Sequence, residues 1–177
     1  MWIEVYCENM SKRMALFLLL ILCFAGFVFG LYAMVGRTNP KLPVSRVSIG
    51  GKTFLAERAE TILARTRGLS GRDSLPEDGG MIFIFSSSTT GGFWMKDMKF
   101  AIDTVWFRKS SPLKILTGKT WEGKVVGVKE NMRPELGKQL WSLKIYYPPK
   151  SIDAALELNA GAVKKYGIQA GDTVVIM

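Results

Sequence analysis

Residues 14–35, MALFLLLILCFAGFVFGLYAMV, are 22 consecutive residues without a charged side chain. At about 1.5 Å per residue, a helix of this length measures about 33 Å and can cross a hydrocarbon layer of about 30 Å. A cleaved signal peptide has a shorter apolar region of about 7–15 residues, and the nearest cleavage-like site here places Leu31 where a small residue is needed. The run therefore predicts an uncleaved, single-pass transmembrane helix.

This run divides the chain into four predicted segments: an N-terminal flank at 1–13, a transmembrane anchor at 14–35, a linker with the sequence GRTNPKLP at 36–43, and a globular domain at 44–177. A positively charged start ahead of an apolar run is typical of a signal anchor, which places the domain on the extracytoplasmic side of the cell membrane. Basic residues flank the run on both sides, so their count alone does not fix the orientation. Met1 and Met10 are both possible starts of the chain.

Histidine is absent from the chain, and both cysteines, Cys7 and Cys23, lie in or before the apolar run. The predicted domain therefore has no thiol, no internal disulfide and no imidazole. These absences exclude Ser-His-Asp and Cys-His triads, thiolate zinc sites and His-ligated haem or iron. No acidic loop with calcium-binding spacing occurs either, so we expect neither a metal nor another cofactor.

The net charge of +9 lies in the part of the chain after the run. Two of the 24 Lys and Arg residues and two of the 15 Asp and Glu residues precede that part, which leaves it 22 basic and 13 acidic residues. This charge favours an anionic envelope polymer, a lipid surface or another envelope protein as partner, although scattered bases are also typical of a solubilising surface. Nucleic-acid-binding motifs are absent, so we expect no nucleic-acid partner.

The domain sequence predicts many short strands. Two β-favouring runs flank Gly50-Gly51, the spacing of a two-residue hairpin turn, and MIFIF at residues 81–85 has the length of a buried strand. Residues 59–67 and 159–166 predict two short helices, and Asn159 is predicted to cap the second. The sequence thus predicts an α+β, mainly β fold: a small barrel or rolled sheet of antiparallel or mixed strands with two short helices, preceded by one transmembrane helix.

The stretch GGFWMKDMKFAIDTVWF at residues 91–107 mixes aromatic and charged residues, which favours neither a buried strand nor a surface loop. Strand alternation would place Phe93 and Met95 on one face and Trp94 and Lys96 on the other. Aromatic rings at a cleft stack on flat or sugar-like groups. We therefore predict a ligand-binding cleft edged by aromatic side chains, with the candidate residues Arg67, Trp94, Lys96, Asp97 and Asp103.

Three acidic residues leave alternatives open. Asp97 is predicted either to act as an acid or base, or to serve a turn or an ion pair with Lys96 or a nearby arginine. Asp103 lies in a run with buried character and needs a partner, for which we predict the guanidinium of Arg67. Glu157 alternates with two leucines, and on a half-buried strand it is expected to face solvent.

Three motifs occur in order along the domain: TRGLSGRDSLPEDGGMIFIF, FWMKDMKFAIDTVWF and AALELNAGAVKKYGIQAGDTV. They resemble the domain-of-unknown-function family 192, an uncharacterised prokaryotic family whose members are often secreted or membrane-anchored. The resemblance covers roughly residues 53–177 and implies a compact, mainly β fold without implying an activity. The chain departs from the family's pattern at Ser70, where a methionine is usual, and in residues 109–142, which are longer than the usual connection.

These features support three hypotheses of function. The first is a membrane-anchored, extracytoplasmic binding or interaction domain with an aromatic-edged cleft. The second is a hydrolase of cell-wall or glycan material that uses Asp97 or Glu157 with Asp103, since glycosidases work with two carboxylates about 5–9.5 Å apart. The third is a structural component of an envelope assembly, in which the basic surface makes the contacts.

Overall fold

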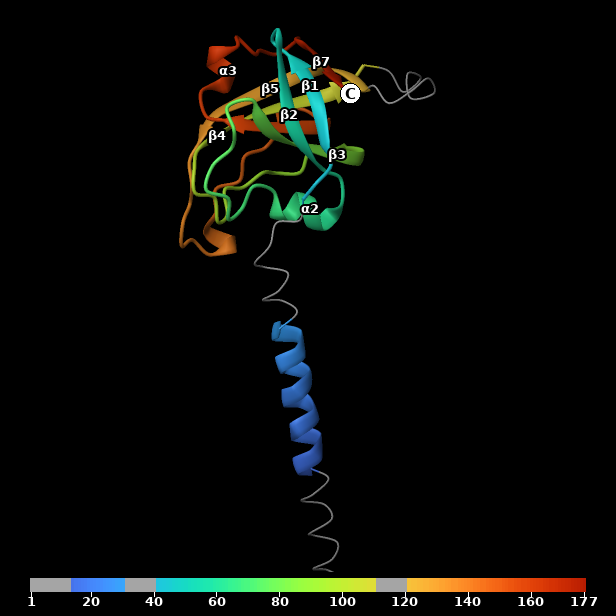
Figure 1. Cartoon of the computed structure of the whole chain (residues 1–177), viewed down its shortest axis with the longest axis vertical. Helices are drawn as coiled ribbons and strands as arrows, with labels where there is room; N and C mark the ends of the chain where they lie inside the picture. Colours follow the sequence, from blue (N-terminus) through green and yellow to red (C-terminus); the bar gives the residue numbers. More distant parts are fainter. Residues whose placement is uncertain (1–13, 31–40, 111–120) are drawn as a thin grey trace, which may run out of the picture. The chain divides into compact units, whose positions relative to one another are not determined.

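The computed structural model of the chain describes residues 14–30, 41–110 and 121–177, in two compact units, Met1–Pro40 and Lys41–Met177 (Figure 1). In the first unit, residues 14–30 form an α-helix with exposed side chains. None of the helices in the described ranges has both the length and the apolar character that crossing a membrane requires. Residues 31–35 of the predicted anchor lie outside the described residues, as do the predicted flank and most of the predicted linker.

The second unit is a closed barrel, built from seven strands in the described part of the chain (Figure 1). The strands are β1 (Val44–Ile49), β2 (Lys52–Ala59), β3 (Gly79–Thr89), β4 (Ile102–Lys109), β5 (Trp121–Met132), β6 (Ile152–Asn159) and β7 (Thr173–Ile176). Their order is β1-β2-β3-β6-β4-β5-β7, and β7 pairs with β1 to close the barrel. Only β2 and β3 pair in parallel among these strands. The predicted small, mainly β barrel of mixed strands is confirmed.

A two-residue turn at Gly50-Gly51 joins β1 to β2, as predicted. The φ angles of the two glycines are 58° and 71°, and positive φ at both positions is what a type I′ hairpin turn requires. A Cβ atom at Gly50 would also stand 2.8 Å from the carbonyl oxygen of Tyr166. Glycine is therefore needed at this corner of the barrel for its conformation and for its size.

The strands carry apolar side chains on both faces and so separate two cores. The interior core gathers residues from all seven strands, including Phe54 and Phe107, which are fully buried. The outer core lies against the outer face of β3, β6 and β4 and includes Met81 and Trp106. Strand β6 contributes residues to both cores, so both of its faces are covered.

The outer core is covered by α2 (Ile62–Arg67), by the turn that follows it and by residues 90–101. Thr61 caps α2, its hydroxyl accepting the N–H of Ala64 at 3.1 Å, and Gly68 ends the helix with φ of 51°. The predicted end of this helix is confirmed. The helix begins later than predicted because β2 continues to Ala59. A 3₁₀-helix, η2 (Leu140–Ser142), adds a short helix that the sequence did not predict.

The other predicted helix is also shorter than expected, since α3 spans only Ala162–Lys165, with Gly161 as its N-cap. Asn159, its predicted cap, is instead the last residue of β6 and pairs with β4. The side-chain amide of Asn159 donates to the carbonyl oxygens of Leu75 at 3.3 Å and Pro76 at 2.8 Å. Asn159 thus fastens the end of β6 to the connection before β3.

Asp103 is fully buried on the interior face of β4, and two backbone amides hold its carboxylate. Oδ1 accepts the N–H of Asn131 at 2.8 Å, and Oδ2 accepts the N–H of Val163 at 2.9 Å. Val163 lies in the first turn of α3, where the cap residue Gly161 has no side chain to accept this N–H. The predicted partner was wrong, because Arg67 belongs to α2 over the outer face of the barrel whereas Asp103 faces the interior.

Replacement of Asp103 by alanine should lower the free energy of unfolding by about 1–3 kcal/mol or slightly more, because it leaves the buried N–H of Val163 without an acceptor, while the partly buried N–H of Asn131 adds less. Denaturant unfolding measures the loss. Asp172→Ala is the matched control: its carboxylate accepts one exposed N–H, that of Gln169 at 2.9 Å, and its removal should cost about 1 kcal/mol at most. Equal losses in the two variants would contradict the role given to Asp103.

Candidate functional site

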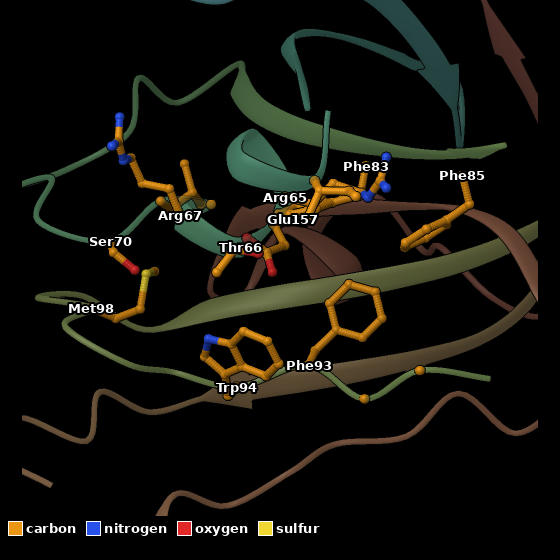
Figure 2. Close-up of a pocket in the computed structure, with 15 residues that line it drawn as sticks. Arg65, Thr66, Arg67, Ser70, Phe83, Phe85, Phe93, Trp94, Met98 and Glu157 are labelled. Carbon is orange, nitrogen blue, oxygen red and sulfur yellow. The ribbon is translucent and has the colours of Figure 1, made fainter. Parts of the chain in front are cut away.

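A pocket of about 180 Å³ lies on the outer face of the barrel, between α2 and residues 91–98 (Figure 2). Strands β3 and β6 form its floor, α2 and the turn after it form one wall, and residues 91–98 form the other. A protein cavity of about 150 Å³ can hold one benzene molecule. The pocket therefore has room for one ring-sized group.

Two bonds join the walls of the pocket and fix its width. The hydroxyl of Ser70, in the turn after α2, donates to the carbonyl oxygen of Lys96 at 2.8 Å. The N–H of Gly71 donates to the carbonyl oxygen of Asp97 at 2.9 Å. These long-range bonds tie α2 and its turn to the opposite wall, so the pocket is formed without a ligand.

Aromatic side chains line the pocket, namely those of Phe83, Phe85, Phe93 and Trp94. Phe83 on the floor meets Phe93 edge to face, with ring centroids 5.9 Å apart and planes at 83°. Trp94 stands at the rim and is 36% exposed, whereas Phe93 and Met95 are buried, as the predicted alternation requires. The predicted strand is absent, since Phe93 makes only an isolated bridge, with Tyr146. The alternation in exposure is therefore present although residues 93–95 form no regular strand.

Glu157 is the acidic residue at the floor of the pocket. In β6 it pairs with Met81 of β3 on one side and with Thr104 of β4 on the other. Its side chain lies on the outer face of the barrel, where only 5% of the residue is exposed. The expectation that Glu157 faces solvent was wrong, because α2 and residues 91–98 cover the outer face of β6.

The carboxyl of Glu157 has no hydrogen-bond donor among the described residues, and it points toward the space beside Phe93 and Trp94 (Figure 2). Burial alone raises the pKa of Glu157 to about 8, since removal from water disfavours the charged form. At pH 7 the group is therefore mostly protonated. It offers one O–H donor and one carbonyl acceptor to whatever enters the pocket.

Two arginines of α2 line the pocket without reaching this carboxyl. Nη1 of Arg65 donates to the carbonyl oxygen of Ile84 at 3.1 Å and to a second backbone carbonyl, and its guanidinium lies 5.4 Å from the ring centroid of Phe85. The guanidinium of Arg67 points away from Glu157 (Figure 2). Neither arginine offsets the effect of burial on the pKa of Glu157.

The pocket includes two of the five predicted site residues, Arg67 and Trp94. Lys96 and Asp97 form an ion pair with each other at the surface, which is one of the alternatives left open for Asp97. Asp103 faces the interior of the barrel and does not line the pocket. The predicted cleft residues are thus divided among three different environments.

The two-carboxylate arrangement needed for the hydrolase hypothesis is not assembled here. Glu157 is the one carboxyl among the described residues that line the pocket, while Asp97 lies at the surface and Asp103 inside the barrel. Within the described ranges, no three His, Cys, Asp or Glu residues gather in a way that could hold a metal ion. The chemistry present is a neutral hydrogen-bonding group in an apolar, ring-sized space.

Glu157, Ser70 and Arg65 line the pocket but were not among the predicted cleft residues, and Glu157 was predicted only as a candidate acid of the hydrolase hypothesis. A signal for Glu157 was present in the sequence IDAALELN of β6. This run has apolar residues at both odd and even positions, which indicates a strand covered on both faces rather than a half-buried one. For Ser70 and Arg65 the sequence offered no comparable signal, because their place depends on how α2 packs on the barrel.

The profile of the family described as DUF192, Uncharacterized ACR, matches residues 45–176 of the chain. A proposed transcription regulator from Sinorhizobium meliloti 1021 is similar in structure, with a TM-score of 0.63 and 25% identity, covering 77% of this chain and 96% of its own. A protein of unknown function from Novosphingobium aromaticivorans DSM 12444 has a TM-score of 0.60 and 22% identity, covering 79% of this chain and 94% of its own. No curated protein matches the chain.

The stability of the domain should fall as the pH rises from about 4.5 to about 8. The raised pKa of Glu157, about 8 against about 4.5 for an exposed glutamate, means that the folded protein keeps a proton that the unfolded chain releases in this window. Above pH 8 the difference reaches about 5 kcal/mol at 1.36 kcal/mol per pKa unit. Urea unfolding from pH 5 to 9 measures it, with Glu157→Gln as the variant that cannot ionise. Parallel pH curves for the two proteins would contradict this assignment.

Proposed function

Since the chain belongs to the uncharacterised DUF192 family, we propose a function from its own pocket: the barrel is a binding module that takes one ring-sized group of a ligand between α2 and Trp94. The observation that carries this proposal is the buried carboxyl of Glu157, which points into the pocket and has no donor within residues 41–110 and 121–177 as the structure describes them. Buried polar groups in folded proteins nearly always have a partner, so an unpartnered one beside an open apolar space favours a partner that comes from outside.

Binding also accounts for the exposed part of the site. Trp94 is large, apolar and 36% exposed at the rim, although its burial in the outer core would be more favourable for folding. A side chain in this position covers a ligand on one face and meets water on the other. An aromatic rim above a small polar floor is the usual composition of a pocket for a small molecule or for one group of a larger one.

We further infer that the module is held at the cell membrane by residues 14–35 and lies on the extracytoplasmic side. Support comes from the sequence, in which 22 uncharged residues follow a basic start. A basic domain beside a membrane would meet anionic lipids and anionic envelope polymers, and its ligand group is then part of such a molecule or of another envelope protein. The hydrolase hypothesis lacks a second carboxylate in the pocket and is not retained.

Replacement of Trp94 by alanine should weaken the binding of any pocket ligand tenfold or more, because it removes the side chain that covers the ligand. A fragment library screened by ¹H–¹⁵N NMR against the full chain in detergent micelles would identify such ligands from shifts in residues 65–70 and 91–98. Trp141→Ala is the matched control, since Trp141 is 85% exposed and does not line the pocket. A screen without any pocket ligand, or ligands that bind both variants equally, would refute the binding proposal.

Two arginines placed in the predicted anchor, by the double substitution Leu19→Arg and Leu22→Arg, should abolish membrane insertion. A charged side chain near the centre of a transmembrane helix costs roughly 2.5–3.5 kcal/mol on the insertion scale, and two such charges would exceed the gain of a single span. Alkaline extraction of membranes from cells producing the full chain distinguishes inserted from soluble protein. Val44→Arg with Leu55→Arg adds the same charge at exposed positions of the barrel and should leave the protein in the membrane pellet.

A further inference from the structure

We infer that the pocket recognises the uncharged amide or lactam edge of a flat, ring-sized group, with the carboxyl of Glu157 donating one hydrogen bond and accepting another. This inference rests on the proposed binding function and names the chemical class of the ligand. Its basis is the position of Glu157: 5% exposed, at the floor of the pocket, and without a donor among the described residues.

The surroundings of Glu157 favour its protonated form. The charged groups that line the pocket with it are Arg65 and Arg67, both from α2, and neither reaches the carboxyl. Among the described residues, β3 and the wall at residues 91–98 place only uncharged side chains and backbone along the pocket. An ionised carboxyl here would have no cation and no donor beside it, whereas a neutral one needs only a donor and an acceptor of its own.

A protonated carboxyl has its donor and its acceptor side by side on one carbon. The group that satisfies both at once must carry an acceptor next to a donor in the same plane, which is the pattern of a primary amide or of a lactam. A ligand with an acceptor alone would leave the carbonyl oxygen of Glu157 unpaired in an apolar space. The adjacent donor and acceptor of protonated Glu157 therefore select an amide or lactam edge on the ligand.

The walls select a flat shape. Phe83, Phe85 and Phe93 present rings around the floor, and the indole of Trp94 closes the rim (Figure 2). Aromatic rings pack most favourably against other flat groups, stacked with an offset or edge to face. With about 180 Å³ available, the space fits one ring together with its amide substituent.

A charged ligand group would fit this pocket less well. An ammonium group would have to pass the guanidinium groups of Arg65 and Arg67 and would find its counterion protonated. A carboxylate could meet Arg65, whose described hydrogen bonds all use Nη1, but only at the edge and not at the floor. The floor is therefore the part of the site that distinguishes neutral from charged groups.

Three compounds with the same ring test this inference: benzamide, benzylammonium and benzoate. Each is titrated into the full chain in detergent micelles, and the indole N–H signal of Trp94, assigned by its loss in Trp94→Phe, reports binding. Benzamide should bind at least tenfold more tightly than either ion at pH 6.5. Its affinity should fall about tenfold or more between pH 7 and 9.5, because ionisation removes the donor. In Glu157→Gln, whose side-chain amide cannot ionise, this pH dependence should disappear.

Other results would overturn the inference in distinguishable ways. Tightest binding of benzylammonium, strengthening as the pH rises, would show that Glu157 binds as an anion. Tightest binding of benzoate would show that the arginines lead recognition. If none of the three compounds binds while the fragment screen still finds ligands in the pocket, the ligand class is wrong and the binding function stands. If the screen finds no pocket ligand, the binding function itself fails.

Discussion

The double coverage of β6 is the constraint on which the rest of this domain depends. One face of the strand fills the barrel and the other lies beneath α2 and residues 91–98, so the side chains of its central residues, 154–158, must suit a dry environment. Closure of the barrel provides the first cover, because β1 and β7 meet. The second cover needs segments from outside the sheet. The pocket is the place where that outer cover is incomplete, and it lies directly above Glu157 on the outer face of β6.

Two carboxyl groups are buried in the barrel, and their different partners separate a structural role from a functional one. Asp103 receives two backbone N–H groups, which fix the start of α3 and the end of β5. Glu157 receives none from the described part of the chain and is mostly protonated at pH 7. Both residues are in neighbouring, directly paired strands, yet they point to opposite faces. The distinction therefore comes from the alternation of the strands and not from the distance between the residues along the sheet.

The sequence was a good guide to features with short-range causes. The Gly50-Gly51 turn, the end of α2 at Gly68 and the burial of Asp103 all follow from local conformation or from a run of apolar neighbours, and all are confirmed. The predicted partner of Asp103 and the exposure of Glu157 were wrong because both depend on which elements cover each face. Long-range packing determines what covers each face of a strand or segment. Trp94 stands at the rim only because α2 and residues 91–98 are joined across the pocket.

The carboxyl of Glu157, which has no partner among the described residues, couples ligand binding to folding stability. Within the proposed function, a ligand that pairs with protonated Glu157 stabilises the folded protein in which Glu157 carries its proton, and ionisation of Glu157 depopulates this form. Linkage between two binding events is reciprocal, so the ligand raises the pKa of Glu157 by the same factor by which ionisation weakens ligand binding. A ligand present at 100 times its Kd adds about 2.7 kcal/mol to stability, which is comparable with the loss that burial of this glutamate imposes near neutral pH. Burial of Glu157 thus lowers the stability of the empty domain near neutral pH. In the occupied domain, the same residue makes stability depend on both the pH and the ligand concentration.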